Sequence, residues 1–249
     1  MVSKQVLFAI IVGAFVGWWQ GEASTQSLNL GTAEWRPWQV VEDGHLTGIT
    51  PGILQELSKR TGCAMNVRPF PHKRMMAAFE KGGIDMEPTV NPSWRDCQSH
   101  ISVYTIPFYT TGDIVLVRKK NAIHATSVRD FYGMNLGCGL GYYYPEGFQE
   151  AFNRGDIHRE DNPVSEKNLQ KLALERLDGI IVDKVQARYL LKKANLDPAD
   201  FVTAYRFKPS KLSLRLHRSR QAFLPALNKA IEEMIADGTI DRIVAKYVE

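Results

Sequence analysis

The chain has 249 residues, 44% of them hydrophobic and 23% charged. It can therefore bury the core of one large domain or two small ones, which excludes a mainly disordered protein. Its 31 Lys and Arg residues exceed its 27 Asp and Glu residues by four, an excess too small and too evenly spread to predict a nucleic-acid groove. The three cysteines, Cys63, Cys97 and Cys138, have neither C-x-x-C spacing nor neighbouring histidines, so we predict no metal site and no cofactor.

The N-terminus has the pattern of a secretory signal peptide. Lys4 precedes an apolar run at residues 6–19, and residues 21–23 (Gly-Glu-Ala) are small where a signal peptidase would cleave. The alternative is a membrane anchor, but the run is shorter than the roughly 20 apolar residues that span a bilayer. We therefore predict that residues 1–23 are removed and that the mature chain begins near Ser24 in the oxidising periplasm.

The first half of the mature chain alternates short strands with helices. We predict a strand at 27–31, a loop at 34–38, a hairpin turn at Asp43-Gly44, a helix from about residue 50 to Gly62, a second helix with Met75, Met76 and Phe79 on one face that ends at Gly82-Gly83, and a strand from Ile84. Thr50 is the expected N-cap of the first helix, because Pro51 then occupies the first helical position.

The second half restarts the same alternation. It predicts a strand at 113–118, a helical turn capped by Ser127, a strand at 135–138, helices at 145–152 and 166–175, a strand at 179–182, a helix at 185–194, a strand at 212–216, and two helices around Asp237-Gly238. Alternating strands and helices imply βα units with parallel sheets, and the restart implies two α/β lobes. Ligands bind beyond the carboxyl ends of such strands, so we expect a binding cleft between the lobes.

Eight segments in order carry a family resemblance: EWRPW at 34–38, DGHLTG at 43–48, FEKGGID at 79–85, NPSWR at 91–95, IPFY at 106–109, LGCGLG at 136–141, RLDGIIVD at 176–183 and ADGTID at 236–241. Together they resemble the polar amino-acid group of periplasmic solute-binding proteins, the receptors of ABC importers. The resemblance implies a two-lobed type II clamshell, in which each lobe is a mostly parallel sheet flanked by helices and two strands cross at the hinge.

The resemblance also implies boundaries and a function. Lobe 1 would comprise residues 24–111 and 210–249, and lobe 2 residues 112–209, with the strands at 113–118 and 212–216 beside the hinges. The mature protein, a monomer, would capture an amino acid or related zwitterion in the cleft and deliver it to an inner-membrane ABC permease. Closure around the ligand would create the form that the importer recognises.

A zwitterion needs one partner for its carboxylate and another for its ammonium group. By resemblance, Arg95 would bind the carboxylate in a bidentate way, and Asp183 would accept the ammonium. Their alternative roles are a surface salt bridge with Asp96 or Glu80 for Arg95, and an N-cap of the helix near Val185 for Asp183.

Five further residues, from three places in the sequence, complete the predicted site. Trp35 would lie against the ligand side chain, although plain core packing is the alternative. Gly141, Tyr142 and Tyr143 stand where the family has Gly-Thr-Thr at a helix N-terminus whose N–H groups would face a carboxylate. Thr89 would replace one of the hydroxyl contacts that the family places before the arginine.

The segment before Arg95 departs from the family pattern. It reads Asp-Met-Glu-Pro-Thr-Val at 85–90, so Glu87 could bind a cationic ligand group or pair internally with Arg74 or Arg36. Cys63 and Cys97 could form a disulfide in the periplasm, worth on the order of 3–4 kcal/mol. Cys138 would then be a buried free thiol.

Two other functions remain open from the sequence. An enzyme on the same fold, such as a dehydratase or lyase, could use Glu87 or Asp183 as a base. However, the chain has no G-x-S-x-G, P-loop or H-E-x-x-H motif, and its six histidines are scattered. The other alternative is a detached ligand-sensing module.

Overall fold

The computed structural model describes residues 26–42 and 45–249. The predicted signal peptide and the predicted turn at Asp43-Gly44 lie outside these residues. Within the described ranges, no helix combines the length and the apolar character that a bilayer span requires.

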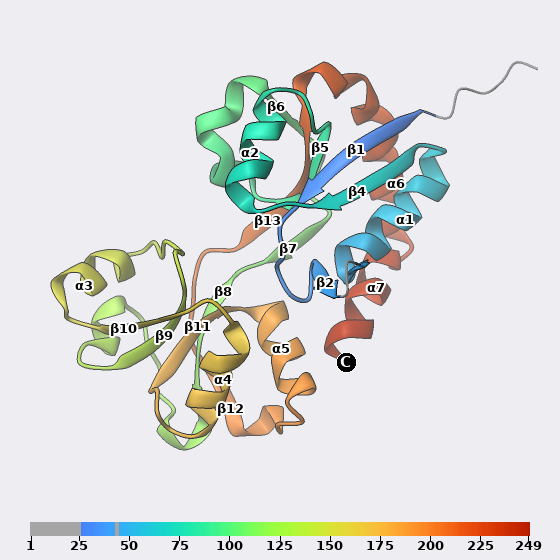
Figure 1. Ribbon diagram of the computed structural model, residues 1–249. Helices are drawn as coiled ribbons and strands as arrows, with labels where there is room; N and C mark the ends of the chain where they lie inside the picture. Colours follow the sequence, from blue (N-terminus) through green and yellow to red (C-terminus); the bar gives the residue numbers. More distant parts are fainter. Residues whose placement is uncertain (1–25, 43–44) are drawn as a thin grey trace, which may run out of the picture.

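Two separate sheets organise the chain (Figure 1). The first sheet has the strand order β4-β1-β5-β13-β6, and β7 also pairs with β13. Its strands are β1 (Ser27–Thr32), β4 (Ala64–Pro69), β5 (Met86–Val90), β6 (Ser102–Tyr104), β7 (Tyr109–Thr111) and β13 (Ser210–His217). Strands β4, β1 and β5 are parallel, whereas β13 runs antiparallel to each of its neighbours.

The second sheet has the strand order β10-β9-β11-β8-β12. Its strands are β8 (Asp113–Arg118), β9 (Asn135–Gly139), β10 (His158–Asn162), β11 (Gly179–Asp183) and β12 (Phe201–Arg206). Strands β10, β9 and β11 are parallel, and β8 is antiparallel to both β11 and β12. Both sheets are therefore mixed, with a parallel half and an antiparallel half, and not mostly parallel as the resemblance implied. A separate hairpin pairs β2 (Val40–Glu42) with β3 (His45–Thr47).

Helices cover both sheets. They are α1 (Ile49–Thr61), α2 (His72–Glu80), α3 (Phe148–Arg154), α4 (Ser165–Ala173), α5 (Lys184–Lys193), α6 (Leu224–Ala236) and α7 (Thr239–Val248), with 3₁₀ helices at Pro92–Ile101, Lys119–Asn121, Val128–Phe131, Pro198–Asp200 and Arg218–Phe223. Helices α1, α6 and α7 share one core with β1, β5 and β13. Two further cores lie on opposite faces of the second sheet, one including α3 and the other α4 and α5.

The chain crosses between the sheets twice, once from β7 to β8 and once from β12 to β13 (Figure 1). Helix α5 of the second sheet also reaches the first, because Val185 packs into the core of α1, α6 and α7. In addition, the side-chain amide of Gln186 donates to the backbone carbonyl of Arg36 at 2.9 Å. The two halves are thus joined by two crossings and by contacts from the start of α5.

The start of helix α1 differs from the prediction. Gly48, not Thr50, is the N-cap, and Thr50 is a buried residue of the first turn. The N–H groups of Ile49 and Thr50 donate to the carbonyls of Pro37 and Trp38, at 3.0 and 2.9 Å. Because backbone carbonyls of the preceding loop satisfy these donors, the helix needs no side-chain cap.

Candidate functional site

Arg95 lies at a kink in the 3₁₀ helix Pro92–Ile101, where its backbone leaves helical geometry. Its Nε donates to the carboxylate of Glu87 at 3.1–3.2 Å, and its Nη2 at 2.5 Å. Its Nη1 donates to the carbonyl of Trp94 at 2.9 Å. Since a guanidinium has five N–H donors, these contacts leave part of the group available to a ligand.

Glu87 holds a second arginine as well. Nη1 of Arg215 donates to the other carboxylate oxygen at 2.8 Å, and the side chain of Arg215 is fully buried. Arg215 also donates to Ser102 Oγ at 2.9 Å and Gln98 Oε1 at 2.7 Å. The internal pairing of Glu87 thus occurs, but with Arg95 and Arg215 and not with the predicted Arg74 or Arg36. Two cations on one carboxylate leave the cluster with a net charge of +1.

Asp183 ends strand β11 and is the N-cap of helix α5. Its Oδ1 accepts from the N–H groups of Val185 and Gln186 at 3.0 and 3.1 Å, so the alternative capping role is confirmed. Its Oδ2 accepts from the hydroxyl of Thr111, next to the first crossing. Burial raises the pKa of Asp183, although these hydrogen bonds oppose the rise.

Thr89 lies in β5 with a positive φ of 59°. Its hydroxyl is 2.6 Å from that of Thr50, which also accepts from the side-chain amide of Gln39 at 2.8 Å. All three residues are buried. The hydroxyl of Thr89 is therefore already engaged within the protein.

Four aromatic side chains form a row from the neighbour of Arg95 towards Thr111. The rings of Trp94 and Trp35 are 5.9 Å apart, those of Trp35 and Trp38 are 5.6 Å apart, and those of Trp38 and Tyr109 are 5.3 Å apart. Trp94 is 43% exposed and Trp38 is fully buried. Of these four aromatic residues, the sequence reasoning predicted only Trp35 as a ligand contact. Trp94 directly precedes Arg95 in the sequence, and this position could have predicted that Trp94 lies near the site.

The segment after β9 differs from what the resemblance implied. Gly141 lies in a turn, Tyr142 and Tyr143 follow it in an irregular segment, and α3 starts only at Phe148. The N–H of Tyr142 donates to the carbonyl of Gly139 at 3.1 Å, so it is not a free donor at a helix N-terminus. The expected helix N-terminus at this segment is therefore wrong, whereas a ligand contact of these residues stays a prediction. The side chains of Tyr142 and Tyr143 are 55% and 68% exposed.

The three cysteines are free thiols, so the considered disulfide between Cys63 and Cys97 is absent. Cys63 directly precedes β4, at one edge of the first sheet, whereas Cys97 lies in the 3₁₀ helix that contacts β6 and β13 near the other edge. Neighbouring strands are about 4.8 Å apart. The width of the sheet thus exceeds the Cα separation of about 6 Å that a disulfide needs.

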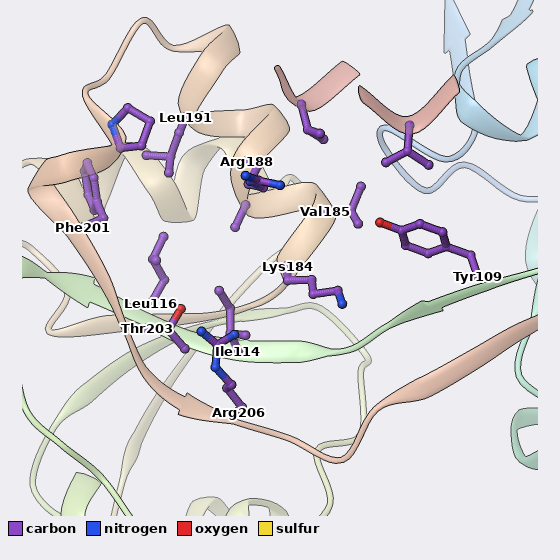
Figure 2. A pocket seen from close by; sticks show the side chains of 14 residues that line it. Tyr109, Ile114, Leu116, Lys184, Val185, Arg188, Leu191, Phe201, Thr203 and Arg206 are labelled. Carbon is purple, nitrogen blue, oxygen red and sulfur yellow. The ribbon is translucent and has the colours of Figure 1, made fainter. Parts of the chain in front are cut away.

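A cavity of about 420 Å³ lies between α5, α7, β8 and β12 (Figure 2). Ile114 and Leu116 line it, together with the cations Lys184, Arg188 and Arg206. Side chains of a strand alternate between its faces, so Asp113 points to the opposite face of β8. The cavity is therefore distinct from the predicted carboxylate and ammonium contacts. Among the described residues, no group of three His, Cys, Asp or Glu side chains could hold a metal ion.

Residues 28–249 match the family described as bacterial extracellular solute-binding proteins, family 3. The chain is 29% identical over 209 residues to the L-cystine-binding protein TcyJ of Escherichia coli strain K12, covering 83% of this chain and 76% of that protein. Among solved structures, an ancestral cationic amino acid solute-binding protein has a TM-score of 0.71 at 20% identity, covering 90% of this chain and 96% of that one.

The unliganded, open L-cystine solute receptor of Neisseria gonorrhoeae has a TM-score of 0.69 at 17% identity, covering 90% of this chain and 93% of that one. These structural neighbours are two-lobed type II periplasmic-binding proteins. Their likeness, together with the two sheets described above, confirms the predicted fold class.

Proposed function

The chain belongs to family 3 of the bacterial extracellular solute-binding proteins and is a solute receptor, not an enzyme, and we propose that its solute is an amino acid or a related zwitterion. The names of its relatives support this ligand class. In the proposal, residues 1–23 are a secretory signal, and the mature protein delivers its solute to an ABC permease as a monomer. Residues 24–111 with 210–249 form one lobe, and residues 112–209 form the other.

The observation that carries the proposal is the arrangement of opposite charges at the two ends of the aromatic row. The cluster of Arg95, Glu87 and Arg215 has a net charge of +1 and belongs to the first sheet. Asp183 belongs to the second sheet and lies beside the crossing that follows Tyr109. A zwitterion along the row would place its carboxylate near Arg95 and its ammonium group near Asp183, with its side chain against the aromatic rings of Trp35 and Tyr142.

Calorimetric titration with a panel of L-amino acids that includes L-cystine tests the proposal. A micromolar ligand has about 8 kcal/mol of binding free energy, and removing one member of a buried charged contact costs roughly 2–5 kcal/mol. We therefore expect Arg95→Ala and Asp183→Asn each to weaken binding by about thirtyfold or more. Asparagine keeps the N-cap of α5 and removes only the charge.

The matched control is Arg154→Ala, because Arg154 is exposed and pairs only with surface groups. Exposed pairs contribute under about 1 kcal/mol, so this variant should bind like the wild type. If neither site variant changes the affinity of an amino acid that binds, the proposed bridge across the two sheets is wrong. If no amino acid in the panel binds the wild type, the ligand class is wrong.

A further inference from the structure

A second carboxylate, Asp113, lies beside Asp183 where the chain enters the second sheet. Strands β8 and β11 are antiparallel, and Asp113 is directly opposite Asp183 in their register. The N–H of Lys184 donates to the carbonyl of Gly112 at 3.0 Å. Hydrogen-bonded and non-hydrogen-bonded pairs alternate along an antiparallel ladder, so Asp113 and Asp183 form a non-hydrogen-bonded pair. In such pairs the two side chains share a face and the Cα atoms are about 4.5 Å apart.

The two carboxylates differ in the number of hydrogen bonds that they accept. Asp183 accepts three hydrogen bonds, from Thr111, Val185 and Gln186. Asp113 is partly buried, and within the part of the chain that the structure describes its carboxylate has no hydrogen-bond donor and no cationic partner. The lone pairs of Asp113 are therefore free to accept from a ligand.

The pKa values of Asp113 and Asp183 are both raised. Burial, and then the charge of Asp183, raise the pKa of Asp113 to about 7. Burial also raises the pKa of Asp183. Two neighbouring carboxylates titrate as a coupled pair. Near neutral pH, the pair of carboxylates therefore carries one proton in a fraction of the molecules.

Among residues 26–42 and 45–249, the groups around Asp113 include no cation that would neutralise it. Those that face it or flank its strand are Asp183 on β11, Tyr142 and Tyr144 on the segment after β9, and Tyr205 on β12, whose hydroxyl donates to Glu146. The nearby cations Lys184 and Arg206 line the cavity on the other face of the sheet (Figure 2).

We propose that Asp113 and Asp183 together form a binding site for a protonated amine, and that binding of the amine releases one proton from Asp113 to the solvent. An ammonium group has three N–H donors. Asp183 has most of its acceptor capacity occupied, so Asp113 supplies the acceptors that the amine still needs. The ammonium keeps its own protons, because its positive charge favours the ionised form of Asp113. The inference rests on the proposed function, in which the amine belongs to the amino acid.

Proton release makes binding pH-dependent. Below the pKa of Asp113 each binding event must expel a proton, so the affinity should rise about tenfold per pH unit as the pH increases. Above that pKa, Asp113 is already ionised and the affinity should level off. Without Asp113, as in Asp113→Asn, the affinity should be lower at pH 8 and should change little between pH 6 and pH 8.

The decisive experiment follows the titration of Asp113 itself, with methylammonium chloride as the probe. Asp side chains are labelled with ¹³C at the carboxyl carbon, and their NMR signals are recorded against pH with methylammonium or with sodium chloride at equal ionic strength. The signal that disappears in Asp113→Asn identifies the residue. We expect methylammonium to shift this titration to lower pH and sodium to leave it unchanged. An identical titration in both salts would overturn the proposal.

Calorimetry with L-cystine, in two buffers of different ionisation enthalpy, counts the protons released on binding. We expect close to one proton near pH 6 for the wild type and for the control Asp200→Asn, whose carboxylate is exposed on the same half of the molecule. Asp113→Asn should release none. L-cystine binding without proton release would reject the inference and leave the proposed function standing. Conversely, a methylammonium effect without binding of any amino acid would keep the amine site and reject the proposed function.

Discussion

Glu87 is the residue on which the carboxylate end of the proposed site depends. It is buried and holds Arg95 and the fully buried Arg215 on its two oxygens. Breaking a buried ion pair by removing one partner leaves an uncompensated charge, which costs more than the pair itself contributes. The orientation of Arg95 and the stability of the first sheet are therefore coupled through this one side chain.

Glu87→Ala should lower the free energy of unfolding by about 3–5 kcal/mol, because it leaves Arg215 buried without a counter-charge. Chemical denaturation measures the change. The control is Glu34→Ala, which removes an exposed partner of Arg36 and should cost under about 1 kcal/mol. Equal, small losses in the two variants would show that Glu87 does not compensate Arg215.

Asp113 gives a pH dependence of stability in the ligand-free protein. Its pKa is raised from 3.8 to about 7 on folding, so the folded state binds more protons than the unfolded state between these values. Stability should therefore fall as the pH rises from about 4 to about 7 through this group. In thermal melts without ligand, Asp113→Asn should melt higher than the wild type at pH 8 and should differ little at pH 4. A lower melting temperature at pH 8 would contradict the assigned burial of the charge.

The sequence could suggest individual site residues but could not predict which residues contact one another. Arg95 and Asp183 were proposed as ligand contacts because motifs surround them. Arg215 was missed because the alternation at 212–216 shows only a strand with leucines on one face. In the structure β13 lies between β5 and β6, and the 3₁₀ helix Pro92–Ile101 packs against it. Burial of Arg215 thus comes from neighbours distant in sequence, which a local pattern does not contain.

At the scale of elements, the loop before α1 joins the aromatic row to the first helix. Gly48 has φ 118°, and a Cβ atom there would lie 2.6 Å from the carbonyl oxygen of Pro37 and 2.7 Å from that of Trp38. These two carbonyls accept from the first N–H groups of α1. The position of Trp38 and the start of the helix are therefore fixed by the same contact.

Gly48→Ala should destabilise the fold by about 2 kcal/mol or more beyond Gly62→Ala. Both glycines have positive φ, but a Cβ at Gly62 would meet nothing within 4 Å. Gly62→Ala therefore reports the backbone cost alone, about 1–2 kcal/mol, while Gly48→Ala adds a backbone clash. Denaturant unfolding compares the two variants, and tryptophan fluorescence should change only in Gly48→Ala. Equal destabilisation would show that the loop can move away from the helix.

Prediction of elements succeeded where periodicity was strong. The helix with Met75 and Phe79 on one face and the helix that ends before Asp237-Gly238 are confirmed, as is the strand at 113–118. Strand β10 was missed because its residues, His-Arg-Glu-Asp-Asn, are polar and it pairs only with β9 at an edge. Edge strands bury little of their surface, so they carry little of the alternation that identifies a strand.

At the scale of the molecule, the restart of the βα pattern after residue 113 predicted two sheets, and the structure has two. The sequence could not predict the antiparallel halves, because the pairing partners of β8 and β13 are distant in sequence. It also could not predict the contact of Gln186 with Arg36, which depends on how the two halves are placed relative to each other.

The two crossings make relative motion of the halves the expected response to a ligand. Few residues connect β7 with β8 and β12 with β13, so small backbone changes there can rotate one sheet relative to the other. A zwitterion held by Arg95 on one side and Asp183 on the other binds the closed arrangement more tightly than the open one, and this difference in affinity drives closure. Small-angle X-ray scattering should show a smaller radius of gyration on addition of an amino acid that binds the wild type.

The variant Asp183→Asn separates closure from binding. At ligand concentrations that saturate it, the contact to the first sheet remains and the contact to the charge of Asp183 is lost, so compaction should be smaller than in the wild type. Arg154→Ala should compact fully, because Arg154 contacts only surface groups. If the saturated wild type shows no decrease in its radius of gyration, the ligand occupies a rigid pocket, and the opposite charges on the two halves do not act as a clamp.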